Sequence, residues 1–396
     1  MRPRSDAASV ATAAMKLLAV TGAAFGLAIA ACGAAAQSAP TPPAQPASGP
    51  GGADYRHRDV MGTSYDGGKT QFWLFEPANP TPEQAPVIVF SHGWGGVDPA
   101  PYRAWIDHIV RRGNIVVYPR FQTDNRTPPR EFTLNAIAAV RAALDVLRND
   151  PNRVPADPGR FALVGHSIGG ALSANLAALA ERAGLPPPRA VMSVEPGKTW
   201  SLTRRVAFPL EDLSTVPRDT LLLAVAGDRD RIARDVDARR IYHETTQVPP
   251  QNKNLVLVAS DYYGSPPLEA HHFAPLARSG AAAPQTSEGR RPGVLRERLE
   301  ERRAARGDIV DNRKPDVRGQ PEARDEDELP DVSAATATTP DALDFYAYWK
   351  LFDALTDAAF YGRNREYALG NTPQQRYMGA WSDGRPVREL IVLDRP

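Results

Sequence analysis

The residues best suited to chemistry are Gly-His-Ser-Ile-Gly at positions 165–169, which fit the pattern G-x-S-x-G. A serine attacks an acyl carbonyl when a tight strand-to-helix turn projects its hydroxyl outward. The backbone of such a turn is strained, so the residues two positions away on each side must be small, as Gly165 and Gly169 are. The pattern therefore predicts that Ser167 is a nucleophile.

The segments on either side of this turn supply the context that the pattern needs. An apolar run typical of a buried strand precedes it at 161–164, and an alanine-rich run typical of a helix follows it at 171–176. A helix that begins at Ile168 points free N–H groups, and the positive end of its dipole, at a developing oxyanion. The alternative is a glycine-rich turn with an incidental serine, because the pentapeptide alone also occurs by chance.

Buried strands alternate with helices along residues 55–276, and this alternation predicts the fold class. Strands are expected at 56–63, 71–75, 86–90, 114–118, 161–164, 190–194, 220–226 and 255–258. Helices are expected at 102–112, 131–147, 235–245 and directly after the turn at Ser167. The expected fold is α/β, with a mostly parallel sheet covered by helices on both faces in a single catalytic domain.

The periodic pattern stops at residues 277–340, which are rich first in alanine and proline and then in mixed charges. Such a composition predicts a disordered insertion, with one transient helix near 295–305, and a folded lid is the alternative. Order is expected to return at 341–396, with an apolar helix over 341–360 that packs on the sheet and an ordered tail.

The overall charge and the cysteine content exclude several classes of protein. The formal net charge is +1, without the basic excess of a nucleic-acid-binding protein. Cys32 is the only cysteine, so neither an internal disulfide nor a cysteine-based metal site can form.

Residues 1–36 have the features of an export signal: basic residues at the start, a short apolar run over 17–31 and small residues after it. The residues Ile-Ala-Ala-Cys that end at Cys32 resemble the bacterial lipobox, in which the cysteine is lipidated. The alternatives are ordinary cleavage after Ala36 and a cytoplasmic protein with an alanine-rich tail. The proline- and glycine-rich residues 37–54 are expected to form a flexible linker.

Four motifs together resemble the serine hydrolases of the α/β-hydrolase fold. They are His-Gly-Trp-Gly-Gly at 92–96 after an early strand, the turn at 165–169, Gly-Asp-Arg-Asp at 227–230 after a later strand, and His-Phe at 272–273. The resemblance covers residues 55–276 and the C-terminal helix. Within this fold the chain looks most similar to the chlorophyllase-, dienelactone-hydrolase- and polyester-hydrolase-like carboxylesterases.

This resemblance implies a role for each member of a catalytic triad. Ser167 would be the nucleophile, where dienelactone hydrolases carry a cysteine instead. The base would be His272 in the sequence His-Phe-Ala-Pro, with His271 as the alternative. The acid would be Asp230, and Glu195 is the alternative because chlorophyllase-like enzymes carry their acid after the preceding strand.

The same resemblance implies an oxyanion hole made by the backbone N–H groups of Trp94 and Ile168. His92 would brace the loop that carries Trp94. A phosphate-binding role for this glycine-rich loop is disfavoured because no P-loop lysine follows it. Between Glu195 and Thr220 only a short loop is present, which favours a relatively open site.

The sequence thus predicts an exported serine hydrolase that cleaves small or polymeric carboxylic esters without a metal or an organic cofactor. It would be periplasmic, anchored in the membrane through a lipidated Cys32, or secreted. Two alternatives stay open: an acyltransferase on the same fold, and a non-catalytic binding protein of the cell envelope.

Overall fold

The computed structural model of the chain describes residues 38–66, 70–124, 126–197, 199, 208–279, 331–333, 335 and 337–393. The chain divides into two units, residues 1–39 and residues 40–396. Of the first unit only Ser38 and Ala39 are described, and the helices and strands of the described residues belong to the second. The expected export signal with Cys32, and the transient helix expected near 295–305, lie outside the described residues.

The second unit is built on a nine-stranded sheet with the order β1-β2-β4-β3-β5-β6-β7-β8-β9. The strands are β1 (Asp59–Tyr65), β2 (Phe72–Ala78), β3 (Ala85–Ser91), β4 (Ile115–Pro119), β5 (Ala156–His166), β6 (Ala190–Val194), β7 (Leu221–Gly227), β8 (Lys253–Val258) and β9 (Ile391–Leu393). Pairing is parallel from β4 through β3 to β8, and it is antiparallel in the pairs β1–β2, β2–β4 and β8–β9. The predicted fold class, α/β with a mostly parallel sheet, is confirmed.

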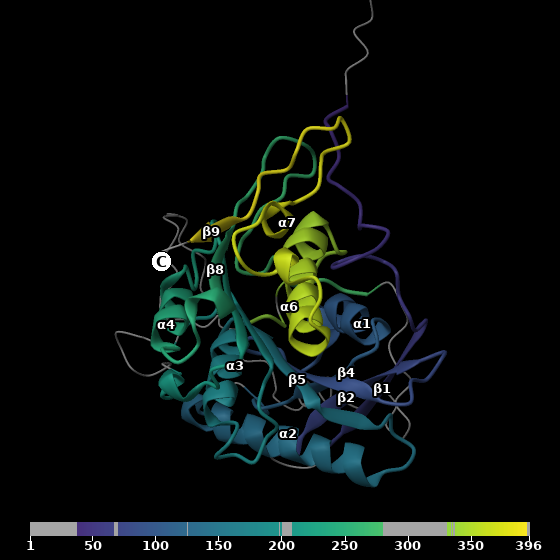
Figure 1. The fold of residues 1–396 in the computed structure, drawn as a ribbon, viewed down its shortest axis with the longest axis vertical. Coiled ribbons are helices and arrows are strands. Elements are labelled where there is room, and N and C mark those ends of the chain that lie inside the picture. Colours follow the sequence, from purple (N-terminus) through teal and green to yellow (C-terminus); the bar gives the residue numbers. More distant parts are fainter. Residues whose placement is uncertain are drawn as a thin grey trace, which may run out of the picture. The chain divides into compact units, whose positions relative to one another are not determined.

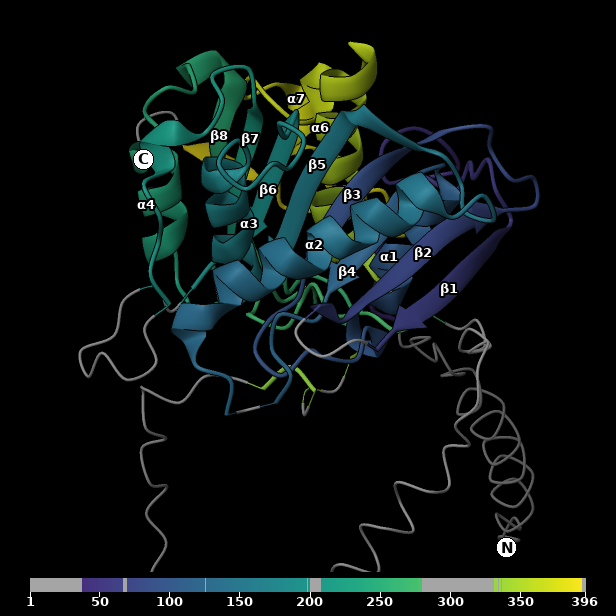
Figure 2. The same cartoon turned by 90° about the horizontal axis from the view of Figure 1, so that it is seen from below.

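Helices cover both faces of this sheet, as Figures 1 and 2 show. The α-helices are α1 (Arg103–Arg111), α2 (Phe132–Asn149), α3 (Ile168–Leu179), α4 (Val236–Glu244), α6 (Lys350–Tyr361) and α7 (Pro373–Arg376); the π-helix η6 (Asp344–Trp349) leads directly into α6. Single 3-10 turns are η2 (Ala100–Tyr102), η3 (Pro129–Glu131), η4 (Leu213–Thr215), η5 (Pro250–Asn252) and η7 (Arg365–Tyr367). Within the described part of the chain, no helix has both the length and the apolar character needed to span a membrane.

Successive residues of the central strands point to opposite faces of the sheet, which creates two hydrophobic cores. In β3, Ile88 and Phe90 join the core that includes α1 and α6, whereas Val87 and Val89 join the core that includes α2 and α3. The strands therefore read as continuous apolar runs in the sequence, as expected for a parallel sheet that is buried on both sides.

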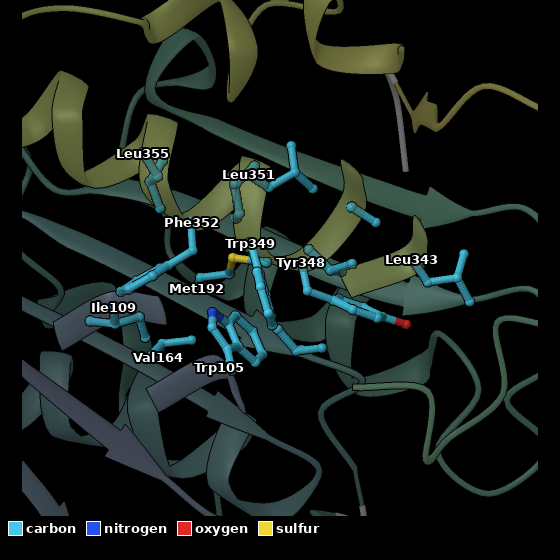
Figure 3. Packing of buried hydrophobic residues seen from close by; sticks show 14 of the residues in the cluster. Trp105, Ile109, Val164, Met192, Leu343, Tyr348, Trp349, Leu351, Phe352 and Leu355 are labelled. Atoms are coloured by element: carbon cyan, nitrogen blue, oxygen red, sulfur yellow. The ribbon is translucent and has the colours of Figure 1, made fainter. Parts of the chain in front are cut away.

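Aromatic side chains from α1 and the C-terminal helix fill the first core (Figure 3). The Trp105 ring lies 6.1 Å from the Tyr348 ring and 6.4 Å from the Phe352 ring, measured between centroids. Met192 from β6 belongs to the same cluster. The apolar helix expected over 341–360 thus packs on the sheet, although its first part is a π-helix.

Residues 40–54 differ from the flexible linker that the sequence predicts. The Pro40 carbonyl accepts a hydrogen bond from the Ser265 N–H at 2.8 Å, and the Ala44 carbonyl accepts one from the Tyr346 hydroxyl at 3.1 Å. At Gly51, with φ of +79°, a Cβ atom would lie 2.1 Å from the Phe345 carbonyl oxygen. This segment lacks apolar side chains for a core of its own, but its backbone packs closely against the folded domain.

The described ends of the expected insertion are also part of the fold. Ala277 and Thr338 form a parallel bridge. Val332 is fully buried, and its N–H donates a hydrogen bond of 2.9 Å to the Trp94 carbonyl. At these described residues Val332 packs over the bare backbone of Gly93 and Gly96, where no side chains compete for the space.

Candidate active site

Ser167 occupies the sharp turn between β5 and α3, as the pentapeptide predicts. Its φ of +58° and ψ of −126° lie outside the regions that a serine ordinarily adopts, so the turn is strained. A Cβ on Gly165 would lie 2.2 Å from the Gly169 carbonyl oxygen, and a Cβ on Gly169 would lie 2.1 Å from that of Ser91. Both glycines are therefore required for the chain segments to pass each other.

The structure places three of the predicted site residues in one hydrogen-bonded series. His272 Nε2 lies 2.9 Å from Ser167 Oγ, and His272 Nδ1 lies 2.8 Å from Asp230 Oδ2. Because a carboxylate can only accept, we assign the proton to Nδ1, which leaves Nε2 to accept from the serine hydroxyl. The three side chains are almost fully buried, with exposed fractions of 2% for Ser167, 5% for Asp230 and 2% for His272.

The neighbouring histidine does not reach this series. His271 is exposed to solvent, and its Nδ1 accepts the N–H of Phe273 at 3.1 Å. Of the two histidines that the sequence offered, His272 alone contacts Ser167 in the structure.

Asp230 has the environment of an ionised carboxylate. Burial by itself would raise its pKa, but the hydrogen bond and the charge of His272, with the backbone N–H groups of Ala233 and Ile232, lower the pKa below its usual range. These two N–H groups donate to Oδ1 at 2.9 and 2.8 Å, so both carboxylate oxygens have partners. The carboxylate is thereby fixed in the orientation that faces the imidazole.

Glu195, the alternative acid, lies close by but makes no hydrogen bond to the base. It follows β6 with φ of +46°, is fully buried, and has Oε2 3.9 Å from His272 Nδ1. Burial and the negative charge of Asp230 raise the pKa of Glu195 well above its ordinary value, against a smaller opposing effect of its hydrogen bond with Tyr348. Glu195 therefore lies beside the series rather than in it, and its surroundings favour its neutral form.

The loop between β3 and η2 presents Trp94 as the predicted second oxyanion donor. The Gly93 N–H donates to the Tyr102 hydroxyl at 2.9 Å, and the Gly95 N–H donates to Gln122 Oε1 at 2.9 Å. The N–H of Trp94 lies between these two anchored groups. Ile168 begins α3, and the first N–H of a helix has no acceptor within the helix. The local fold therefore leaves the N–H groups of Trp94 and Ile168 in positions consistent with the predicted oxyanion hole.

His92 contacts the backbone of this loop and supports it, as the sequence predicts. Its Nδ1 lies 2.6 Å from the Gly93 carbonyl oxygen, and its ring stacks on Phe121 with centroids 4.1 Å apart. The Trp94 ring instead packs towards Phe132 on α2, with centroids 5.9 Å apart, which closes the second core.

Two buried residues that the sequence did not mark as functional also contact the site. His166 Nδ1 lies 2.8 Å from the Tyr102 hydroxyl, and His166 Nε2 lies 2.7 Å from the His272 carbonyl oxygen. His166 could have been noticed in the sequence because it directly precedes the nucleophile, at the buried end of β5. Tyr102 carried no signal beyond an apolar helix face.

The ligand atoms of His166, Glu195 and His272 lie within 4.8 Å of one another, a spacing that could suit a metal ion. The ring nitrogens of His166 and His272, however, all have hydrogen-bond partners in this arrangement. A metal ion would have to displace the contacts of His272 with Asp230 or Ser167, or those of His166 with Tyr102 or the His272 carbonyl, so the arrangement does not favour metal binding.

Comparison with known proteins agrees with this architecture. Residues 88–242, from β3 to α4, match a family model described as alpha/beta hydrolase fold. No curated protein matches the chain.

Proposed function

We propose that this chain, part of which matches the alpha/beta hydrolase fold, is a serine hydrolase that cleaves carboxylic esters through an acyl-enzyme intermediate. The observation that carries the proposal is the series from Asp230 through His272 to Ser167, with hydrogen bonds of 2.8 and 2.9 Å. A scaffold of this fold that only binds a partner would have no need to keep a strained serine, a base and an ionised acid in register.

In the first step, Ser167 Oγ attacks the ester carbonyl carbon while His272 Nε2 takes the hydroxyl proton. The imidazolium that forms is stabilised by the Asp230 carboxylate. The carbonyl oxygen becomes an oxyanion and accepts hydrogen bonds from the N–H groups of Trp94 and Ile168. These donors belong to the backbone, so they are in place before the charge develops.

The intermediate collapses when the bond between the carbonyl carbon and the alkoxy oxygen breaks. His272 Nε2 returns its proton to the departing alcohol, which leaves Ser167 acylated. A water molecule then attacks the acyl group while His272 again takes a proton, and the carboxylic acid is released. An alcohol in place of that water would make the same site an acyltransferase.

Hydrolysis of p-nitrophenyl esters of increasing acyl length tests the proposal. We expect activity in the wild type and a loss of about 10⁴-fold or more in Ser167→Ala. The matched control is Ser173→Ala, further along α3, where the hydroxyl donates to the Gly169 carbonyl. Equal activity of the wild type and Ser167→Ala would overturn the mechanism. Added alcohol that diverts the acyl group to a new ester would identify an acyltransferase.

The proposal extends to a closer likeness with the chlorophyllase-, dienelactone-hydrolase- and polyester-hydrolase-like esterases. The pentapeptide, the Gly-Asp-Arg-Asp loop and the His-Phe pair support this subgroup. Ser167 departs from the dienelactone hydrolases, which carry a cysteine at that position. A preference for bulky or polymeric esters over acetate in the same assay would support the likeness.

We propose further that the protein is exported and anchored through Cys32. The basic start, the apolar run and the single cysteine after Ala-Ala support this proposal. Metabolic labelling with palmitate is expected to mark the wild type and not Cys32→Ala. Labelling that persists in Cys32→Ala would refute the anchor, and a mature N-terminus directly after Ala36 would identify ordinary cleavage instead.

A further inference from the structure

Two buried side chains outside the triad connect its two halves. Tyr102, fully buried at the end of η2, has its hydroxyl 2.9 Å from the Gly93 nitrogen and 2.8 Å from His166 Nδ1. His166, fully buried at the end of β5, has Nε2 2.7 Å from the His272 carbonyl oxygen. The contacts run without a break from the loop that carries Trp94 to the loop that carries His272.

The direction of each hydrogen bond in this path is fixed by chemistry. A carbonyl oxygen can only accept, so His166 Nε2 carries a proton and donates a hydrogen bond to the His272 carbonyl oxygen. Burial, and then the neighbouring His272, lower the pKa of His166 to about 3, so its Nδ1 is unprotonated at neutral pH and accepts from the Tyr102 hydroxyl. The same hydroxyl oxygen accepts the N–H of Gly93. In each of the three hydrogen bonds a donor therefore faces an acceptor.

We propose that Tyr102 and His166 are positioning residues that tie the oxyanion loop to the loop of the catalytic base, so that the hole and the base are set by one hydrogen-bonded path. Tyr102 holds Gly93, and this fixes the next N–H along the chain, that of Trp94. His166 holds the main chain of His272, and this fixes the distance from its ring to Ser167. The inference rests on the proposed function of the site.

The position of His166 in the sequence strengthens this assignment. It directly precedes Ser167, so a shift of its ring is transmitted to the strained turn itself. The two loops that it joins follow β3 and β8, which are separated in the sheet by β5, β6 and β7. The Tyr102–His166 path therefore connects two distant parts of the sheet edge directly beside the nucleophile.

Tyrosine-to-phenylalanine substitutions test the first half of the path. Tyr102→Phe removes one buried hydroxyl, and the matched control is Tyr118→Phe, since Tyr118 is equally buried and its hydroxyl contacts the Gly96 carbonyl of the same loop. We expect kcat for a p-nitrophenyl ester to fall by about tenfold or more in Tyr102→Phe with KM changed by less than about threefold, and by less than about threefold in Tyr118→Phe. Thermal unfolding of the variants checks that both are folded.

Substitutions of His166 test the second half. The amide nitrogen of glutamine reaches the place of Nε2, so His166→Gln keeps a donor for the His272 carbonyl, whereas His166→Ala keeps none. We expect His166→Ala to lose kcat by about tenfold or more and His166→Gln to recover part of that loss. The rate of labelling by a fluorophosphonate, which reports the reactivity of Ser167 without a substrate, is expected to follow the same order.

Three outcomes would overturn the inference. They are equal kcat in Tyr102→Phe and Tyr118→Phe, a loss confined to KM, and a His166→Gln variant no better than His166→Ala. If the wild type hydrolyses esters and reacts at Ser167 while these variants match their controls, the inference fails and the proposed function stands. If the wild type neither hydrolyses esters nor reacts at Ser167, the proposed function fails and the inference fails with it.

Discussion

Two buried carboxyl groups lie near the same imidazole nitrogen, and their surroundings shift their pKa values in opposite directions. Asp230 Oδ2 is 2.8 Å from His272 Nδ1, and Glu195 Oε2 is 3.9 Å from it. The backbone N–H groups that face Asp230 stabilise its charge, whereas the buried position of Glu195 beside that charge opposes a second one. Asp230 is therefore assigned as the acid of the triad, because backbone N–H groups stabilise its charge.

Conservative substitutions of the two acids should separate their roles. Asp230→Asn is expected to lower kcat by about 10⁴-fold, because an amide can leave His272 in the wrong tautomer. Glu195→Gln is expected to lower kcat by less than about tenfold, because an amide resembles the neutral acid in shape and hydrogen bonding. The measurement is kcat for one p-nitrophenyl ester in both variants. The reverse order of the two losses would assign the acid to Glu195.

The sequence could predict Ser167 because its turn needs small residues at fixed spacing. It favoured His272 over His271 only through the resemblance of His-Phe-Ala-Pro to related esterases, because residue types alone do not show which ring the loop turns inward. It also left Tyr102 and His166 without a role, since their partners are a backbone N–H and a backbone carbonyl that no residue pattern records.

At the scale of elements, a buried carboxylate fixes the segment that precedes β1. Asp353 Oδ2 on α6 accepts the Gly51 N–H at 2.7 Å and lies 2.8 Å from His108 Nε2 and 3.2 Å from Arg112 Nε. Burial alone would raise the pKa of Asp353, but the charges of His108 and Arg112 lower it below its usual range. The Asp353 side chain on α6 thus contacts both α1 and the segment at residues 40–54.

Removal of this carboxylate should loosen the N-terminal segment and leave the active site intact. Asp353→Ala is expected to lower the free energy of unfolding by about 3–5 kcal/mol, because Arg112 then lacks its buried partner. The control is Asp54→Ala, whose exposed side chain pairs with the same arginine and should cost about 1 kcal/mol or less. Urea unfolding measures both, and kcat per folded molecule should not change. Equal losses of stability would contradict the role given to Asp353.

The helices and central strands could be predicted because their apolar spacing reflects the face that each one buries. The strand β9 could not, because three residues are too few to show a period. The packing of residues 40–54 was also hidden, since it depends on backbone atoms that meet Asp353 and Tyr346 from distant parts of the chain.

At the scale of the whole molecule, buried histidines make the stability depend on pH. Burial is the largest effect on His92 and lowers its pKa to about 4. The unfolded chain binds a proton on this residue below about pH 6.5, whereas the folded chain does so only below about pH 4. Between these values protonation favours the unfolded chain, so the contribution of His92 to stability falls as the pH decreases.

Glu195 and Asp344 are buried acids with raised pKa values, so their contributions to stability grow as the pH decreases. The effect of His92 is therefore measured as the difference in stability between the wild type and a His92 variant. We expect the stability advantage of the wild type over His92→Asn to shrink by about 3 kcal/mol between pH 6.5 and pH 4. Leu147→Ala removes buried apolar atoms near the C-terminal end of α2 and leaves the Phe121 ring on His92 in place, so its difference from the wild type should not depend on pH. Urea unfolding at several pH values provides the measurement, and a pH-independent difference for His92→Asn would contradict this account.

Covalent labelling can show whether Ser167 is a nucleophile activated by His272 and Asp230. The folded protein is treated with a fluorophosphonate, and the modified peptide is located by mass spectrometry. We expect one adduct on Ser167, no adduct in Ser167→Ala and strongly slowed labelling in Asp230→Asn. An adduct on another serine, or labelling of Ser167→Ala at the rate of the wild type, would contradict it.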